Sequence, residues 1–413
     1  RPIAVDLFAG AGGMSLGFEQ AGFDVVAAVE IDPIHAAVHR FNFPNCAVLA
    51  RSVEGLSASD IRKAANIGER SVDVVFGGAP CQGFSLIGKR AIDDPRNNLV
   101  REFVRITREL GASSFVFENV KGLTLGTHRQ FLDELIAEFE AAGYCVQKSW
   151  QVLNATSYSD PQDRDRLILM GSKKKSNLPH YPAPTTRHPN SKRSLFDIPP
   201  GPTCKDALGD LPNADDFYAL MESDCVETDA WGIPSDYAAR LRCVDSAGWW
   251  FGHVRIWNPK ILTSSIRTVH TDISKLRFSE TLPGSVEPIS RFFKLPPDGV
   301  SNTLRAGTDA ARGAFTSPRP IHYLYPRCIT VREMARLHGY PDWFRFHSTK
   351  WHGARQVGNS VPPPMARAVA SAVLQALGKN PSRPKEAVNL GDPSWLHLVM
   401  EQATELFGLE RRI

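Results

Sequence analysis

The chain has 413 residues, of which 42 % are hydrophobic and 22 % are charged, and its formal net charge is +4. This composition excludes a disordered or fibrous chain and predicts a globular protein of two or three domains, while so small a charge says little about a nucleic-acid partner. No apolar run approaches the ~20 residues of a membrane span, so we expect no transmembrane helix. The seven cysteines form no CxxC pair, which argues against a disulfide framework and a zinc site and favours a reducing cytosol.

The first part of the chain alternates short apolar runs with helical patterns. It opens on a predicted strand and shows no signal-peptide pattern. Runs typical of buried parallel strands occupy 3–8, 25–31, 72–76 and 114–118. Helical spacing occupies 13–21, 33–41, 98–110 and 128–142. The alternation predicts a doubly wound α/β domain, and a later, antiparallel pair is expected at 145–154 and 166–172.

The composition and periodicity of the sequence change after residue 172. Seven prolines between residues 179 and 202 interrupt regular structure, and little helical periodicity appears before about 328. Helical patterns return at 330–340 and 362–379, and an amphipathic stretch follows around Trp395–Phe407. The middle stretch therefore predicts a separate, irregular domain.

A Gly-rich segment, DLFAGAGG at 6–13, joins the first predicted strand to the first predicted helix. Glycine permits a tight turn and a close approach of backbone to a ligand, although a turn without a ligand is the alternative for the glycines alone. Glu30 lies 20 residues past Gly10 at the end of the second strand, where a carboxylate meets ribose hydroxyls in nucleotide-binding units. The glycines do not fit G-x-G-x-x-G, which disfavours a nicotinamide cofactor and leaves S-adenosylmethionine as the alternative.

A cysteine follows the third predicted strand, in the segment GGAPCQGFS at 77–85. Cys81 would lie at the ligand edge of an open sheet, where nearby backbone N–H groups can lower the pKa of a thiol. A buried structural cysteine is the alternative on this segment alone. The polar residues that continue to Asn98 form a segment that could move over a bound substrate.

Five blocks of the sequence resemble, in order, the signature blocks of the cytosine-5 DNA methyltransferases of bacterial restriction–modification systems. They are DLFAGAGGMSLGF, GGAPCQGFS, FENV (117–120), QDRDR (162–166) and QVGNSVPPPMA (356–366), and 330–344 is similar to the family's ninth block. The resemblance implies a Rossmann-like, S-adenosylmethionine-dependent methyltransferase domain with a smaller, irregular target-recognition domain. We expect a catalytic and cofactor-binding domain at 1–172, target recognition at 173–345, a return to the catalytic domain at 346–379 and a C-terminal extension at 380–413.

The resemblance implies transfer of a methyl group to C5 of cytosine in a short sequence of double-stranded DNA. Addition of the Cys81 thiolate at C6 would make C5 nucleophilic, on a base flipped out of the duplex. Glu118 would engage N3 and the exocyclic amine. Arg164 and Arg166 would hold the site and contact the cytosine, Arg166 at its O2. We name no side-chain base for the C5 proton, for which water is the candidate, and we expect no metal.

The resemblance also implies two binding sets. The cofactor pocket would be lined by Phe8, Gly10, Ala11, Gly12, Glu30, Ile31, Pro80, Leu99, Asn359, Ser360 and Val361. The residues expected to contact DNA are Gln82, Ser85, Lys89, Arg90, Arg96 and Arg305. Further candidate base readers are Arg255, Lys260, Arg267, Arg277 and Arg291. This sequence departs from the family's pattern at the expected contact with the cofactor adenine. The family places an acid against the adenine amine, but no aspartate stands at 48–54. Ser52 is the candidate substitute.

Two other functions share this scaffold. A tRNA cytosine-5 methyltransferase would carry a Cys-Phe-Thr tripeptide in the variable region, and none is present. A non-catalytic DNA-binding homologue is disfavoured because Cys81, Glu118 and both arginines are intact. For the leading interpretation we expect a monomer in the bacterial cytoplasm, associated with the nucleoid through DNA and not with a membrane. A genetic partnership with a restriction endonuclease is left open.

Overall fold

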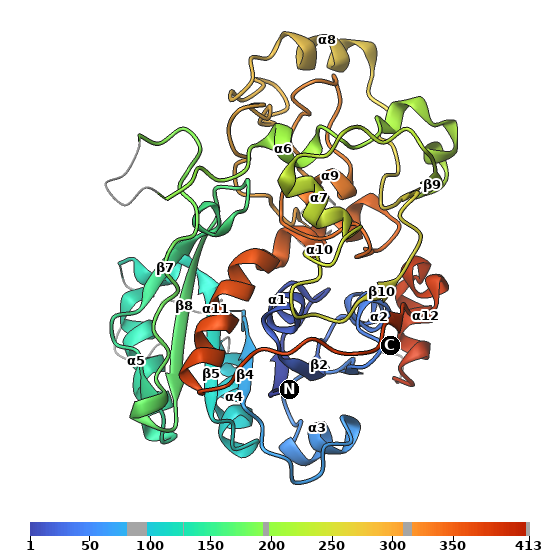
Figure 1. The fold of residues 1–413 in the computed structure, drawn as a ribbon. Helices are drawn as coiled ribbons and strands as arrows, with labels where there is room; N and C mark the ends of the chain where they lie inside the picture. The colour runs from blue at the N-terminus through green and yellow to red at the C-terminus, as the bar shows by residue number, and fades with distance from the viewer. Residues whose placement is uncertain (81–96, 127, 193–197, 309–315, 410–413) are drawn as a thin grey trace.

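The structure is a computed structural model that describes residues 1–80, 97–126, 128–192, 198–308 and 316–409. Within these ranges an eight-stranded sheet forms the centre, with strand order β3-β2-β1-β4-β5-β8-β6 and with β7 paired to β8 (Figure 1). The strands are β1 (Ile3–Leu7), β2 (Asp24–Val29), β3 (Ala47–Leu49), β4 (Val74–Gly77), β5 (Ser114–Val120), β6 (Cys145–Val146), β7 (Gln151–Asn154) and β8 (Asp165–Ser172). The first five are parallel, and β8 runs antiparallel to β5.

Helices cover both faces of the sheet, which confirms the predicted doubly wound α/β fold. They are α1 (Gly13–Ala21), α2 (Pro33–Asn42), α3 (Ala58–Ala64), α4 (Asn98–Glu109) and α5 (His128–Ala141). All the strands and helices expected before residue 142 are present. The short β3 and α3 were not expected, and the strand expected at 145–154 is divided into β6 and β7.

The local sequence explains where α2 begins. The Asp32 side chain accepts hydrogen bonds from the backbone N–H groups of Ile34 and His35, and Pro33 stands in the first turn, where its missing N–H costs nothing. This start fixes the position of the segment that joins β2 to α2. Glu30 and Ile31, two residues of the expected cofactor pocket, lie in that segment.

The strand order reverses between β1 and β4, because the chain builds outward from β1 in one direction and from β4 in the other. At such a point the connections diverge, and a crevice opens beyond the carboxyl ends of the strands. The Gly-rich turn after β1, Glu30 after β2, Gly78 after β4 and Glu118 near the end of β5 all lie at this edge.

Where the structure describes it, the region between β8 and residue 330 contains only short elements, as expected. They are α6 (Cys204–Leu208), α7 (Asp236–Arg242), α8 (Asp272–Glu280), β9 (Val226–Glu227), β10 (Arg255–Ile256), β11 (Ile261–Leu262) and several 3₁₀ turns. It shares one buried apolar cluster with α1 and the sheet. A buried ion-pair network joins it to α9 (Val331–Arg336), where Arg336 lies 2.9 Å from Asp210 and 2.6 Å from Asp342.

The end of the chain returns to the first domain. Helix α10 (Lys350–Asn359), which was not expected, leads into α11 (Pro363–Ala376). Helix α11 packs so closely on α1 that a Cβ on Gly17 would lie 2.5 Å from the Cβ of Ala366, and this confirms the expected docking of the late helix. Beyond it, β12 (Val388–Asn389), η9 (Pro393–His397) and α12 (Met400–Leu406) run back to α2 (Figure 1). Among the described residues, none of the helices has the length and apolar content to span a membrane.

Candidate active site

The turn after β1 adopts a left-handed backbone that suits its glycines. Gly10 has φ 54° and Gly12 has φ 105°. The backbone N–H of Gly10 donates to Glu30 Oε2 at 2.8 Å, and that of Asp32 donates to Glu30 Oε1 at 2.9 Å. Both carboxylate oxygens are therefore fixed at the rim of the turn, with lone pairs to spare for hydroxyl donors.

A cavity of about 510 Å³ runs from this turn along the carboxyl edge of the sheet. Most of the expected cofactor residues line it: Phe8, Gly10, Ala11, Glu30, Ile31, Pro80, Asn359, Ser360 and Val361. The last three come from the end of α10 and the residues after it, as the resemblance implied. Further residues that line the cavity were not predicted from the sequence: Asp6, Met14, Asp32, His35, Gly78, Arg355 and Gln356.

Two residues expected in the cofactor pocket, Gly12 and Leu99, are not among those that line this cavity. A Cβ on Gly12 would meet the Phe43 ring at 2.4 Å, so this glycine faces α2 and serves the turn. Leu99 packs, partly buried, against the apolar cluster beneath α4 and α5. The sequence offered no way to see either placement, because both depend on side chains that belong to other elements.

The turn after β4 leads to the expected nucleophile. A Cβ on Gly77 would collide with the Leu7 carbonyl oxygen at 1.8 Å, and one on Gly78 would lie 2.4 Å from Glu118 Oε2. Asn119, which the sequence analysis did not single out, is buried and donates from Nδ2 to the Ala79 carbonyl at 3.0 Å. This bond fixes the path into Pro80. Cys81 itself lies outside the described residues, as do Gln82, Ser85, Lys89, Arg90 and Arg96.

Glu118 and Arg166 form a shielded ion pair beside Gly78. Arg166 Nε lies 2.7 Å from Glu118 Oε1, and the two side chains are only 12 % and 13 % exposed. Burial raises the pKa of the Glu118 carboxyl, and this effect outweighs the opposing influence of Arg166 and Arg164. A carboxyl whose pKa is raised in this way holds its proton more readily than a free glutamate does, so it is suited to donate a hydrogen bond to a ring nitrogen.

Arg164 does not contact the substrate side of the cavity, and that part of the expectation was wrong. Its side chain has no exposed surface. It donates to the carbonyls of Leu304 at 2.9 Å, Gly358 at 2.7 Å and Ser360 at 2.8 Å. Burial lowers its pKa to about 9. Arg164 thus ties the end of α10 and the loop before Arg305 to β8, which is the holding role that was also expected.

Arg305 lies on the loop that Arg164 holds. Its side chain is exposed, and the preceding Leu304 donates its N–H to Gln162 Oε1 at 3.1 Å. The loop presses on α10, where a Cβ on Gly358 would lie 2.4 Å from the Ala306 nitrogen. Arg305 therefore sits at the junction of the variable region and the candidate active site.

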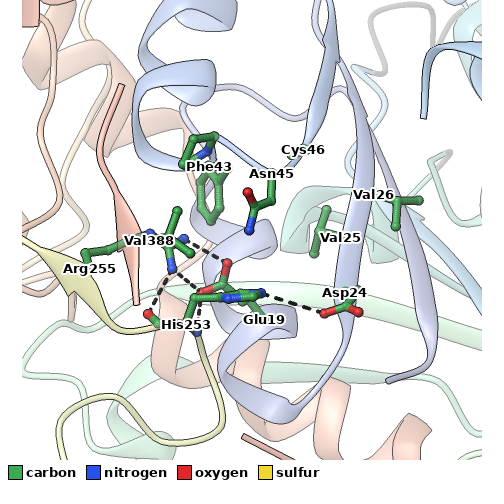
Figure 2. A pocket seen from close by; sticks show the side chains of 11 residues that line it. Glu19, Asp24, Val25, Val26, Phe43, Asn45, Cys46, His253, Arg255 and Val388 are labelled. Carbon is green, nitrogen blue, oxygen red and sulfur yellow. Dashed lines mark hydrogen bonds and ion pairs between the residues drawn. The ribbon is translucent and has the colours of Figure 1, made fainter. Parts of the chain in front are cut away.

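Arg255 is not a base reader, contrary to one expectation. It is 3 % exposed, and its guanidinium donates to both oxygens of Glu19, at 3.0 and 2.8 Å (Figure 2). This pair borders a cavity of about 180 Å³ that also includes Asp24 at the amino end of β2, away from the candidate site. Three other candidates form ion pairs with acids of their own region: Lys260 with Asp229, Arg267 with Asp215 and Arg277 with Glu287. Arg291 is exposed.

The cavity suits a nucleoside better than a metal ion. No group of three potential metal ligands occurs among the described residues. Glu30 offers a fixed carboxylate, and next to it Ile31 presents an apolar side chain that is 54 % exposed. His35, which also lines the cavity, has a buried Nε2 without a hydrogen-bond partner. These residues fit the ribose and base of S-adenosylmethionine.

Comparison with known proteins identifies the family. A family model, described as C-5 cytosine-specific DNA methylase, matches residues 4–375. The chain belongs to this family. The Type II methyltransferase M.XorII of Xanthomonas oryzae pv. oryzae is 55 % identical over 413 residues, which cover 100 % of this chain and 94 % of that protein. M1.HphI of Haemophilus parahaemolyticus is 32 % identical over 90 % of this chain and 86 % of its own.

A solved structure agrees with this assignment. It is described as a DNA modification methyltransferase encoded within a prophage of E. coli, and it is 31 % identical to this methylase with a TM-score of 0.72. The match covers 92 % of this chain and 100 % of that one. The predicted family, fold class and enzyme class are confirmed, and neither the tRNA methyltransferase nor the non-catalytic homologue is favoured.

Proposed function

We propose that this methylase takes S-adenosylmethionine as its cofactor and methylates C5 of a cytosine that is flipped out of a short sequence in double-stranded DNA. The observation that carries the proposal is the shielded Glu118–Arg166 pair, because Glu118 lines the same cavity as the Gly-rich turn and Glu30. When bound, the cofactor supplies an electrophilic methyl group. The protein must then make C5 of the cytosine nucleophilic.

The residues divide this task. Cys81, as its thiolate, forms a bond to C6 of the cytosine, and protonated Glu118 donates a hydrogen bond to N3, where the displaced electron pair accumulates. Arg166 orients Glu118 and contacts O2 of the cytosine. C5 then takes the methyl group. Water removes the C5 proton, the C5–C6 double bond re-forms, and Cys81 leaves as the thiolate.

Binding residues prepare this geometry. Glu30 accepts hydrogen bonds from the ribose hydroxyls, while the turn at Phe8–Ala11 and the returning segment at Asn359–Val361 line the rest of the cofactor cavity. Arg164 is a positioning residue, because it holds the returning segment and the Arg305 loop in place.

DNA recognition involves the variable region and the segment that follows Cys81. Residues 173–345 select the sequence, Arg305 faces the DNA at the edge of the site, and the basic residues at 82–96 meet phosphates. The Type II relatives support a role in bacterial restriction–modification. We further propose that the enzyme is a monomer that acts on cytoplasmic DNA, and that it has the genetic partnership with a restriction endonuclease that such a role entails.

The experiment is methyl transfer from radiolabelled S-adenosylmethionine to duplex DNA by the purified full chain, followed by bisulfite sequencing. The expected result is label in duplex DNA at one cytosine of one short sequence, and none with Cys81→Ala. Absence of transfer to any duplex, or transfer to RNA alone, would overturn the proposal.

A further inference from the structure

A second cavity, of about 690 Å³, adjoins the cofactor cavity and shares Ile31 and Asp32 with it. One wall comes from Pro33 and from the residues after β3, Ala50–Ser52. The opposite wall comes from the C-terminal extension, in and just after α12: Met400, Glu401, Thr404 and Leu409. This extension lies beyond residues 4–375, the part of the chain that the family model matches.

The extension is firmly attached at this place. Leu396 of η9 is fully buried in a small cluster with Ala11 of the Gly-rich turn. The backbone N–H of Ser348 donates to the Leu396 carbonyl at 2.9 Å, and the guanidinium of Arg40 on α2 lies 4.8 Å from the Trp395 ring. Helix α12 therefore has a defined position beside α2 (Figure 1).

The lining of the second cavity matches the chemistry of a purine. Ile31 and Met400 leave 54 % and 49 % of their surfaces exposed, and a flat aromatic ring would cover apolar side chains of this kind. The cavity also offers two acceptors for an amino group, the Ser52 hydroxyl and the Glu401 carboxylate. Of the two, the carboxylate is the stronger acceptor because it is charged.

The position of Glu30 indicates which part of the cofactor the second cavity would hold. If this carboxylate holds the ribose, as in the proposed function on which this inference rests, the base on that ribose extends past Ile31 and Asp32 into the second cavity. We infer that the C-terminal extension forms the outer wall of the adenine pocket, with Met400 against the ring and Glu401 accepting a hydrogen bond from the 6-amino group. The extension would thus supply the acidic contact to the adenine amine, for which residues 48–54 offer no aspartate.

The test measures binding of two ligands to the full chain by calorimetry: S-adenosylhomocysteine and S-inosylhomocysteine, in which an oxo group replaces the 6-amino group. The wild type should prefer the adenosyl ligand by about tenfold or more, because a hydrogen bond to a charged acceptor is lost with the other. Glu401→Gln should lose most of this preference. Glu405→Gln, a matched change one turn further along α12 at an exposed position that does not line the cavity, should keep it.

Met400→Ala provides a second measurement that does not depend on Glu401. It should weaken both ligands by a similar factor, because the contact with the ring does not involve the 6-position. A preference that survives Glu401→Gln, or that is lost equally in Glu405→Gln, would overturn the inference while methyl transfer by the wild type still supports the proposed function. If the wild type binds neither ligand, the proposed function itself fails.

Discussion

Gly78 stands where any side chain would strike the proposed catalytic carboxylate. A Cβ there would lie 2.4 Å from Glu118 Oε2, about 1 Å short of the 3.4 Å at which ordinary contact begins. The other oxygen, Oε1, is held 2.7 Å from Arg166 Nε, so the carboxylate can move aside only by disturbing that pair. For Gly78→Ala we expect a displacement of the carboxylate by about 1 Å and a fall in the methyl-transfer rate of about 10²-fold. The loss of stability should be only about 1–3 kcal/mol, since a side-chain end gives way more easily than backbone.

The assay is single-turnover methyl transfer to duplex DNA, with the affinity for S-adenosylhomocysteine measured in parallel. Gly122→Ala is the control, because its new Cβ would meet nothing closer than Val120 Cγ2 at 3.9 Å. We expect the control to match the wild type in both measurements, and Gly78→Ala to match it in affinity alone. A wild-type rate in Gly78→Ala would refute the reasoning, as would a slow rate explained entirely by lost cofactor affinity.

Further predictions concern the same carboxyl and the buried ion-pair network. Glu118→Gln should lower the transfer rate by about 10²–10⁴-fold with little change in S-adenosylhomocysteine affinity; a near-normal rate would remove Glu118 from catalysis. Burial raises the pKa of Glu118, and activity that needs its protonated form should be lost as the pH rises through that pKa. Arg166 opposes this shift, so Arg166→Ala should move the alkaline limb of the kcat/KM profile to higher pH, and a downward move would contradict the assignment. Arg336→Ala should lower the free energy of unfolding in urea by about 3–5 kcal/mol, because Asp210 and Asp342 would be left buried without their cation; a change below ~1 kcal/mol would be inconsistent with the network.

The parts of the fold that local pattern determines were predictable from the sequence. The strands that became β1, β2, β4 and β5 are short, apolar and buried on both faces, so their composition alone marks them. The placement of Glu30 at the rim of the Gly-rich turn followed from its distance along the chain from Gly10. In contrast, β3 has three residues, too few for a periodic pattern to emerge.

Contacts between distant segments could not be predicted from the sequence. In the sequence, Arg164 and Arg255 look alike as basic residues that could contact DNA, yet partners 140 to 236 positions away bury both of them. The docking of Leu396 against Ala11 is of the same kind. A residue's type limits its chemistry, but whether it faces the substrate or the protein interior depends on these long-range contacts.

The central claim is that Cys81 carries out covalent catalysis at the edge defined by Pro80 and Glu118. The most direct measurement is the reaction of the full chain with S-adenosylmethionine and duplex DNA that contains 5-fluorocytosine at the target position, because fluorine blocks the release of the enzyme. We predict a one-to-one adduct that survives denaturation and maps by mass spectrometry to Cys81. It should form in Cys225→Ala, a control at a partly exposed cysteine of the variable region, and be absent in Cys81→Ala. An adduct of equal yield in Cys81→Ala would contradict the account.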